Sequence, residues 1–132
     1  MSTLFTKIIN QEIPSYKLYE DELFYSFLDI RPISEGHSLV IPKIEVDHFF
    51  DLPDEYLSKM MIFSRPLVKA IERAIPCLRV GLLVAGLEVP HAHLHCVPIQ
   101  DMKRFSFAFA KEASSEQLER VHQQILNELP AT

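Results

Sequence analysis

Hydrophobic residues recur along the chain with two different spacings, which predict helices and strands. Apolar residues three to four positions apart predict a short N-terminal helix ending near Asn10, a long helix between Asp51 and Pro76, and a last helix over residues 115–129. Short apolar runs predict strands at 17–19, 24–28, 37–42, 79–84 and 91–97. Because these elements do not alternate as βαβ units, we expect an α+β fold with a mainly antiparallel sheet.

Several polar and proline residues predict where these elements begin and end. Asp51 is placed to cap the long helix, and Pro66 should interrupt and kink it. Ser114 and Gln117 have the spacing of a capping box at the start of the last helix. The acidic segment 20–22 should form a turn between the first two strands, and Pro98 should end the last strand.

Composition narrows the class of protein. The 132 residues fit a single domain over 1–132, with ordinary globular proportions of 48% hydrophobic and 23% charged residues. The net charge of −5 disfavours a nucleic-acid partner, and the absence of a long apolar run disfavours a membrane partner. The start of the chain lacks the pattern of a secretory signal, and the two cysteines lack CxxC spacing, so we expect a cytoplasmic protein.

Three histidines alternate with apolar residues near the end of the predicted sheet. On a strand, His91, His93 and His95 would share one face, and the apolar residues Ala92, Leu94 and Cys96 would share the other. Such a row could bind a metal ion, attack an electrophile covalently, or bind a phosphate without chemistry. A metal site is the weakest of these, because the outer histidines would lie about 13 Å apart along a strand.

The segment His91–Val97 matches the motif of the histidine triad, or HIT, family at every position. Other parts of the chain resemble the same family in the expected order, namely 5–14, 19–22, 27–30, 36–43 and 52–55. The chain therefore resembles the HIT nucleotide-binding proteins over about residues 3–100. This resemblance implies a HIT-like fold, a homodimer, and no cofactor or metal. Because the motif ends in His95 rather than glutamine, the chain is similar to the hydrolases of that superfamily.

The resemblance also implies a function and a set of site residues. A purine nucleotide or nucleotide conjugate, of phosphoramidate or dinucleotide type, would be hydrolysed at its α-phosphorus. His93 would attack and form a nucleotidyl-histidine intermediate, and the main-chain carbonyl of His91 would fix the tautomer of His93. His91 and His95 would support the phosphate and orient His93, and His37 would back the triad by hydrogen bonding. Asp29 would bind the ribose hydroxyls. The base would lie among apolar residues, which are Leu4, Phe5, Ile8, Phe27 and Ile30.

Two departures from the family pattern suggest an alternative. Leu87 and Glu88 stand where many members carry Gln and Ser or Thr in contact with the phosphates. A carboxylate there would repel the substrate and favour a protonated imidazole. The alternative function is therefore a nucleotide-binding regulatory module with little or no turnover. Thr3 and Thr6 replace the cysteine pair of zinc-carrying relatives, so no structural zinc is expected.

Overall fold

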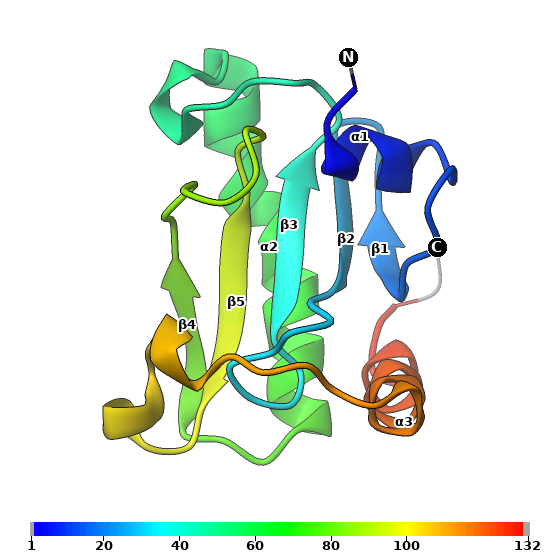
Figure 1. The fold of residues 1–132 in the computed structure, drawn as a ribbon, viewed down its shortest axis with the longest axis vertical. Coiled ribbons are helices and arrows are strands. Elements are labelled where there is room, and N and C mark those ends of the chain that lie inside the picture. Colours follow the sequence, from blue (N-terminus) through cyan, green and yellow to red (C-terminus); the bar gives the residue numbers. More distant parts are fainter. Residues whose placement is uncertain (1, 131–132) are drawn as a thin grey trace.

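The computed structural model describes residues 2–130, which form one antiparallel sheet covered by helices on both faces (Figure 1). The five strands lie in the order β1-β2-β3-β5-β4, and every neighbouring pair is antiparallel. Their bounds are β1 Lys17–Glu20, β2 Phe24–Leu28, β3 Ser38–Pro42, β4 Arg79–Leu83 and β5 Leu94–Ile99. The predicted α+β class and the mainly antiparallel sheet are therefore confirmed.

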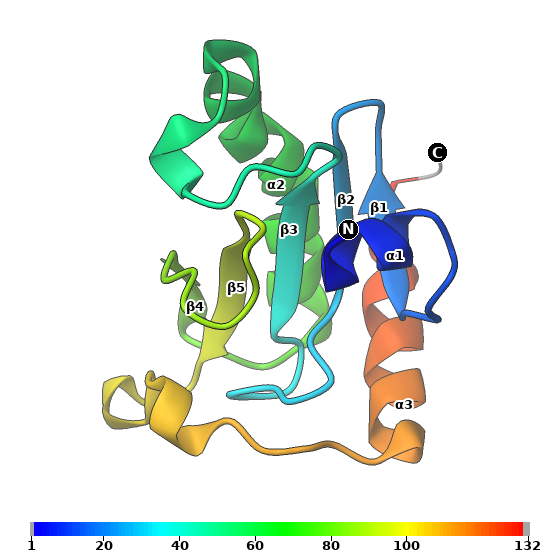
Figure 2. The same ribbon diagram turned by 45° about the horizontal axis from the view of Figure 1, so that its top comes forward.

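Within the described part of the chain, three α-helices pack around the sheet. They are α1 Leu4–Ile9, α2 Asp54–Ala74 and α3 Ser115–Leu126, and short 3₁₀ turns lie at Phe49–Asp51, Met102–Arg104 and Phe107–Phe109. Figures 1 and 2 show α2 behind the sheet and α1 in front of β1 and β2, on the opposite face. None of the helices within residues 2–130 combines the length and the apolar character needed to cross a bilayer.

Each face of the sheet has its own hydrophobic core. In β2, Phe24 and Leu28 pack into the larger core with α2 and α3. The alternate residues Tyr25 and Phe27 pack with Phe5 of α1 in a smaller core. Because side chains of a strand point alternately to its two faces, a central strand covered on both sides is apolar almost throughout. All five residues of β2 are accordingly buried.

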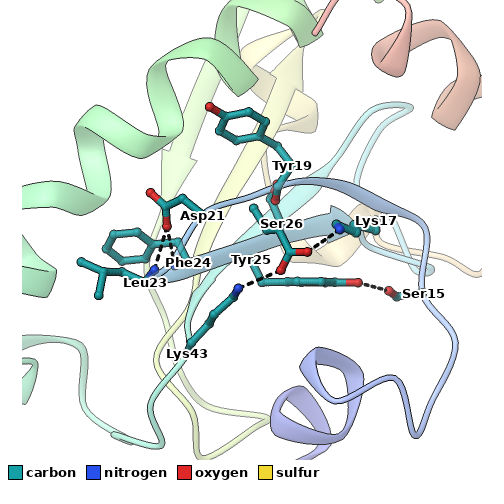
Figure 3. A network of polar contacts seen from close by, with 10 residues as sticks. Ser15, Lys17, Tyr19, Asp21, Leu23, Phe24, Tyr25, Ser26 and Lys43 are labelled. Atoms are coloured by element: carbon teal, nitrogen blue, oxygen red, sulfur yellow. Dashed lines mark hydrogen bonds and ion pairs between the residues drawn. The ribbon is translucent and has the colours of Figure 1, made fainter. Parts of the chain in front are cut away.

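The first hairpin is held by charged side chains at its turn (Figure 3). Asp21 Oδ1 accepts hydrogen bonds from the backbone N–H groups of Leu23 at 2.8 Å and Phe24 at 2.9 Å. Glu20 pairs with Lys17 on its own strand and with Lys43, whose Nζ lies 2.8 Å away just beyond β3. The predicted turn between the first two strands is present, but it covers residues 21–23, because Glu20 still belongs to β1. The Glu20 carboxylate ties the hairpin to Lys43 just beyond β3.

The long helix begins later than predicted. Asp51 belongs to a 3₁₀ turn, and α2 starts at Asp54 with Pro53 as its N-cap. A residue before proline is disfavoured in helical conformation, and Leu52 is indeed extended with ψ 143°. From Asp54 the helix continues through Pro66 to Ala74.

The last strand is shifted relative to the prediction. It spans Leu94–Ile99 instead of 91–97, and Pro98 lies within it. The carbonyl of Pro98 accepts from Ser34 Oγ at 2.6 Å. Backbone N–H and C=O of one strand residue point to the same side, so the missing N–H of Pro98 faces the Ser34 side, beyond the last pair of β3 with β5 at Cys96. Proline therefore costs no hydrogen bond with β4 here.

The last helix has the predicted cap and buried face. Ser114 Oγ accepts from the backbone N–H of Gln117 at 3.1 Å. Leu118, Val121 and Ile125 are buried in the larger core, although α3 ends at Leu126 rather than near 129.

This packing leads to a stability prediction for α3. Ile125 is fully buried, so Ile125→Ala should lower the free energy of unfolding by about 2–5 kcal/mol. Gln123 is exposed on the same helix, and Gln123→Ala should change it by less than about 0.5 kcal/mol. Urea unfolding of both variants at one protein concentration provides the test. Equal losses would contradict the packing of α3 against the core.

Candidate active site

The three histidines of the motif converge although they do not form one strand. Only His95 lies in β5, whereas His91 and His93 belong to the preceding loop. Neither β3 nor β4 pairs with residues 91–93, and the N–H of Ala92 instead donates to the carbonyl of Val46 at 2.7 Å. The predicted strand over these residues is therefore wrong. The rings of His93 and His95 nevertheless contact each other, with centroids 4.9 Å apart.

His91 is fully buried, and both of its ring nitrogens are engaged. Nε2 lies 2.9 Å from the carbonyl of Pro42, so it carries the proton and donates it. Nδ1 lies 2.7 Å from the hydroxyl of Thr3 and accepts from it. What His91 offers to the rest of the site is its backbone carbonyl.

That carbonyl fixes the tautomer of His93. His93 Nδ1 donates to the His91 oxygen at 2.7 Å, so the lone pair on Nε2 is free. Burial lowers the pKa of His93 below its ordinary value of 6.5; the bond to His91 and the charge of Glu88 oppose this shift but do not cancel it. His93 is therefore a neutral imidazole with a nucleophilic nitrogen at neutral pH.

A second chain of hydrogen bonds fixes the tautomer of His95, which is the opposite of that of His93. The N–H of Ile33 donates to His37 Nδ1 at 2.9 Å, so the proton of the neutral His37 ring is on Nε2. This Nε2 lies 2.9 Å from His95 Nδ1 and donates to it, which leaves the proton of His95 on Nε2. Burial is the main cause that lowers the pKa of His37 to about 3 and that of His95 to about 4. The two rings therefore stay neutral, and His95 is a hydrogen-bond donor.

Asp29 lies directly after β2, beside these rings. Its Oδ1 accepts from the backbone N–H of Arg31 at 2.8 Å, and its Oδ2 is 3.6 Å from His37 Nε2. Burial, and to a smaller extent the charge of Glu88, raises the pKa of the Asp29 carboxyl. A second acceptor oxygen thus remains for a hydroxyl donor.

Asp29, His37 and His95 form a cluster whose ligand atoms lie within 4.8 Å of one another. A metal ion would need a lone pair on His37 Nε2. That nitrogen carries the proton, because Nδ1 already accepts from Ile33. The donor set therefore does not fit a metal ion.

A cavity of about 220 Å³ opens onto these groups. His93 and His95 line it, as do Asp29 and Glu88 and all five residues predicted to contact the base, which are Leu4, Phe5, Ile8, Phe27 and Ile30. His37 and His91 do not line the cavity, but they hydrogen-bond to the two histidines that do. The cavity therefore brings an apolar wall, a carboxylate, an imidazole lone pair and an imidazole N–H together.

Sequence reasoning missed several residues of this site. Thr3 caps α1 and forms a hydrogen bond with His91, a role that its position in place of a zinc-ligand cysteine does not suggest. Ile13, Ser15, Leu39 and Val89 line the cavity as well. Thr3 directly precedes the apolar residues of α1, and this position is an N-cap signal that could have identified it. The other four residues carry no pattern that distinguishes them from ordinary core.

The fold and the site together define a small α+β domain in which an apolar cavity opens onto two neutral histidines. The profile of the HIT domain matches residues 10–102, and the chain belongs to the HIT family. The family and the fold predicted from the motif are therefore confirmed.

Comparison with individual proteins agrees with this assignment. The adenosine 5'-monophosphoramidase HNT1 of Saccharomyces cerevisiae is 38% identical over 129 residues, covering 96% of this chain and 82% of that protein. The adenylylsulfatase HINT3 of Arabidopsis thaliana is 34% identical over 125 residues, covering 84% and 64%. A crystal structure of a Hit-like protein involved in cell-cycle regulation from Bartonella henselae superposes with a TM-score of 0.85 at 28% identity, covering 97% and 96% of the two chains.

The lowered pKa values predict how stability depends on pH. The unfolded chain protonates His37 and His95 near pH 6.5, whereas the folded rings do so only near pH 3 and pH 4. Between these values the unfolded state binds more protons, so the free energy of unfolding should fall as the pH is lowered. Each ring should contribute a loss of about 2 kcal/mol between pH 7 and pH 5.

Urea unfolding at a series of pH values measures this dependence. The variant His95→Asn lacks one of the two rings and should show a shallower slope than the wild type. An equally steep slope would mean that the protons are taken up elsewhere.

Proposed function

We propose that this chain is a purine nucleotide hydrolase that cleaves a bond at the α-phosphorus through a nucleotidyl-His93 intermediate. The observation that carries the proposal is the pair formed by the free Nε2 of His93 and the N–H of His95 at one end of an apolar cavity. The two curated relatives described above are named as hydrolases of adenosine 5'-monophosphoramide and of adenylyl sulfate, which supports the same class of reaction.

The cavity suggests how a nucleotide would bind. The purine base lies among the apolar side chains of α1 and β2, with Phe5 and Phe27 in edge contact at 5.7 Å. The free carboxylate oxygen of Asp29 accepts from the ribose hydroxyls, since a carboxylate is a good acceptor for a diol. This arrangement directs the α-phosphate to His93 and His95.

Two displacements at phosphorus then complete the reaction. The Nε2 lone pair of His93 forms a P–N bond as the bond between phosphorus and the leaving group breaks, and the leaving group takes up a proton. The bond from His93 Nδ1 to the His91 carbonyl stabilises the positive charge that develops on the ring. Donation from His95 Nε2 stabilises the phosphoryl oxygens. Water then attacks phosphorus as the P–N bond breaks. Its oxygen stays on the released nucleotide, a proton passes to solvent, and neutral His93 is restored.

His93→Ala tests this mechanism. Turnover of an adenosine phosphoramidate should be abolished, while AMP affinity measured by calorimetry should stay within about tenfold, because the lost interaction belongs to the transition state. His48→Ala removes an exposed histidine outside the cavity and should retain activity. Undiminished turnover in His93→Ala would refute the role of His93.

Mass spectrometry distinguishes this proposal from the regulatory module. Glu88 gives that alternative its support, because a carboxylate on the cavity wall opposes phosphate binding. A covalent AMP adduct after brief exposure to the phosphoramidate supports the enzyme. Nucleotide binding without an adduct supports the module, and activity that is lost with a chelator supports a metal-dependent reaction.

We also propose that the protein is a cytoplasmic homodimer that binds neither nucleic acid nor membranes. Strand β4 is an edge of the sheet, and Leu82 and Val84 at this edge are 38% and 47% exposed. An exposed apolar edge favours pairing with a second copy, for which a two-fold axis is the commonest arrangement. The net charge of −5 and the free thiols of Cys77 and Cys96 agree with these assignments.

Sedimentation velocity at micromolar concentration should reveal the dimer. Leu82→Glu should shift it toward monomer, because it introduces a charge at the apolar edge. The substitution Glu119→Gln, on an exposed part of α3, should not. A wild-type monomer at this concentration would exclude the dimer.

A further inference from the structure

A second cavity adjoins the first at the reactive histidines. Its volume is about 190 Å³, and it is lined by residues 85–88, by Phe107 and by His93 and His95. Glu88, His93 and His95 line both cavities. The two spaces therefore meet where the proposed function puts the α-phosphorus. A nucleoside in the first cavity would leave the second for the other substituent on phosphorus.

The walls of the second cavity combine apolar surface with one carboxylate. Ala85, Leu87 and Phe107 contribute the apolar part, and the ring of Phe107 contacts His95 edge-on with centroids 4.9 Å apart. Glu88 is the acidic residue at the boundary. It has no ion-pair partner among residues 2–130.

The electrostatics of both cavities are unusual for a phosphate site. Among residues 2–130, no lysine or arginine lines either cavity, and the charged groups that do are the carboxylates of Asp29 and Glu88. The adjacent histidines are neutral, as derived above. Additional negative charge on a substrate would therefore be repelled, and positive charge beyond the phosphorus would be attracted. This disfavours the polyphosphate chain of a dinucleotide.

We propose that the second cavity binds the leaving group, and that Glu88 selects amines whose carbon chain ends in a positive charge. This inference rests on the proposed function and specifies its substrate class as nucleoside phosphoramidates of cationic amines. The carbon chain lies against Leu87 and Phe107, and the terminal ammonium pairs with Glu88. The P–N bond breaks at the other end of the amine, and the freed nitrogen takes its proton from water, so the ammonium is unchanged by the reaction.

Three adenosine 5'-phosphoramidates of equal chain length test this selection. Their amines end in an ammonium, a methyl or a carboxylate group, and the measured quantity is kcat/KM for each. The wild type should favour the ammonium over the carboxylate substrate by at least about tenfold, the ratio expected for opposite charges near one exposed carboxylate. Added salt should reduce this ratio.

Two variants test whether Glu88 causes the preference for the ammonium substrate. Glu88→Gln removes the charge at nearly constant volume and should reduce the ratio to within about threefold of unity. Glu119→Gln removes the same charge from exposed α3, outside both cavities, and should keep the wild-type ratio.

The outcomes separate this inference from the function on which it rests. Hydrolysis of all three substrates at similar rates would overturn the selection by Glu88 and leave the hydrolase proposal intact. A wild-type ratio that persists in Glu88→Gln would overturn the assignment to Glu88. Failure to hydrolyse any of the three would overturn both proposals.

Discussion

The site depends on the fact that a neutral imidazole carries a proton on only one of its two nitrogens, while the other nitrogen is an acceptor. A partner on one nitrogen therefore determines what the other can do. The backbone supplies both of the decisive partners. The Ile33 N–H makes His95 a donor through His37, and the His91 carbonyl makes His93 an acceptor. Two chemically identical side chains thus acquire opposite roles from two peptide groups.

Burial keeps this arrangement from being lost to protonation. A ring that took up a second proton would become a donor on both nitrogens. It could then no longer accept a hydrogen bond through the nitrogen that is the acceptor in the neutral state. Because desolvation holds the pKa values of all four rings below the ordinary value, the neutral state persists at physiological pH. No buried side-chain polar atom in residues 2–130 lacks a hydrogen-bond partner. The two cores on opposite faces of the sheet therefore serve the chemistry as well as the fold.

The sequence predicts the secondary structure better than it predicts the hydrogen-bond partners of the histidines. Periodicity places α1, α3 and the first two strands well, since apolar spacing and capping are local properties. It misplaces the start of α2 and both ends of β5. Those boundaries depend on Pro53, which acts on the residue before it, and on where β3 stops pairing, which is set far away in the chain. The motif brings His93 and His95 together as expected, and the resemblance to the family implies both the His91 carbonyl and His37 as their partners. The Ile33 N–H, which sets the tautomer of His37, lies outside the motif and could not be predicted from it.

The attachment of α1 has a practical consequence for handling the protein. This helix supplies one wall of the cavity that His93 and His95 line. Its capping residue Thr3 donates a hydrogen bond from its hydroxyl to the buried Nδ1 of His91, and the Thr3 N–H donates to Glu45 at 2.8 Å. A few residues at the beginning of the chain are thus joined to the loop that presents the reactive imidazole. An affinity tag or a trimmed terminus that displaces Thr3 leaves an imidazole nitrogen unpaired in the interior. Any change at this end that displaces Thr3 therefore also alters the surroundings of the loop that carries His93.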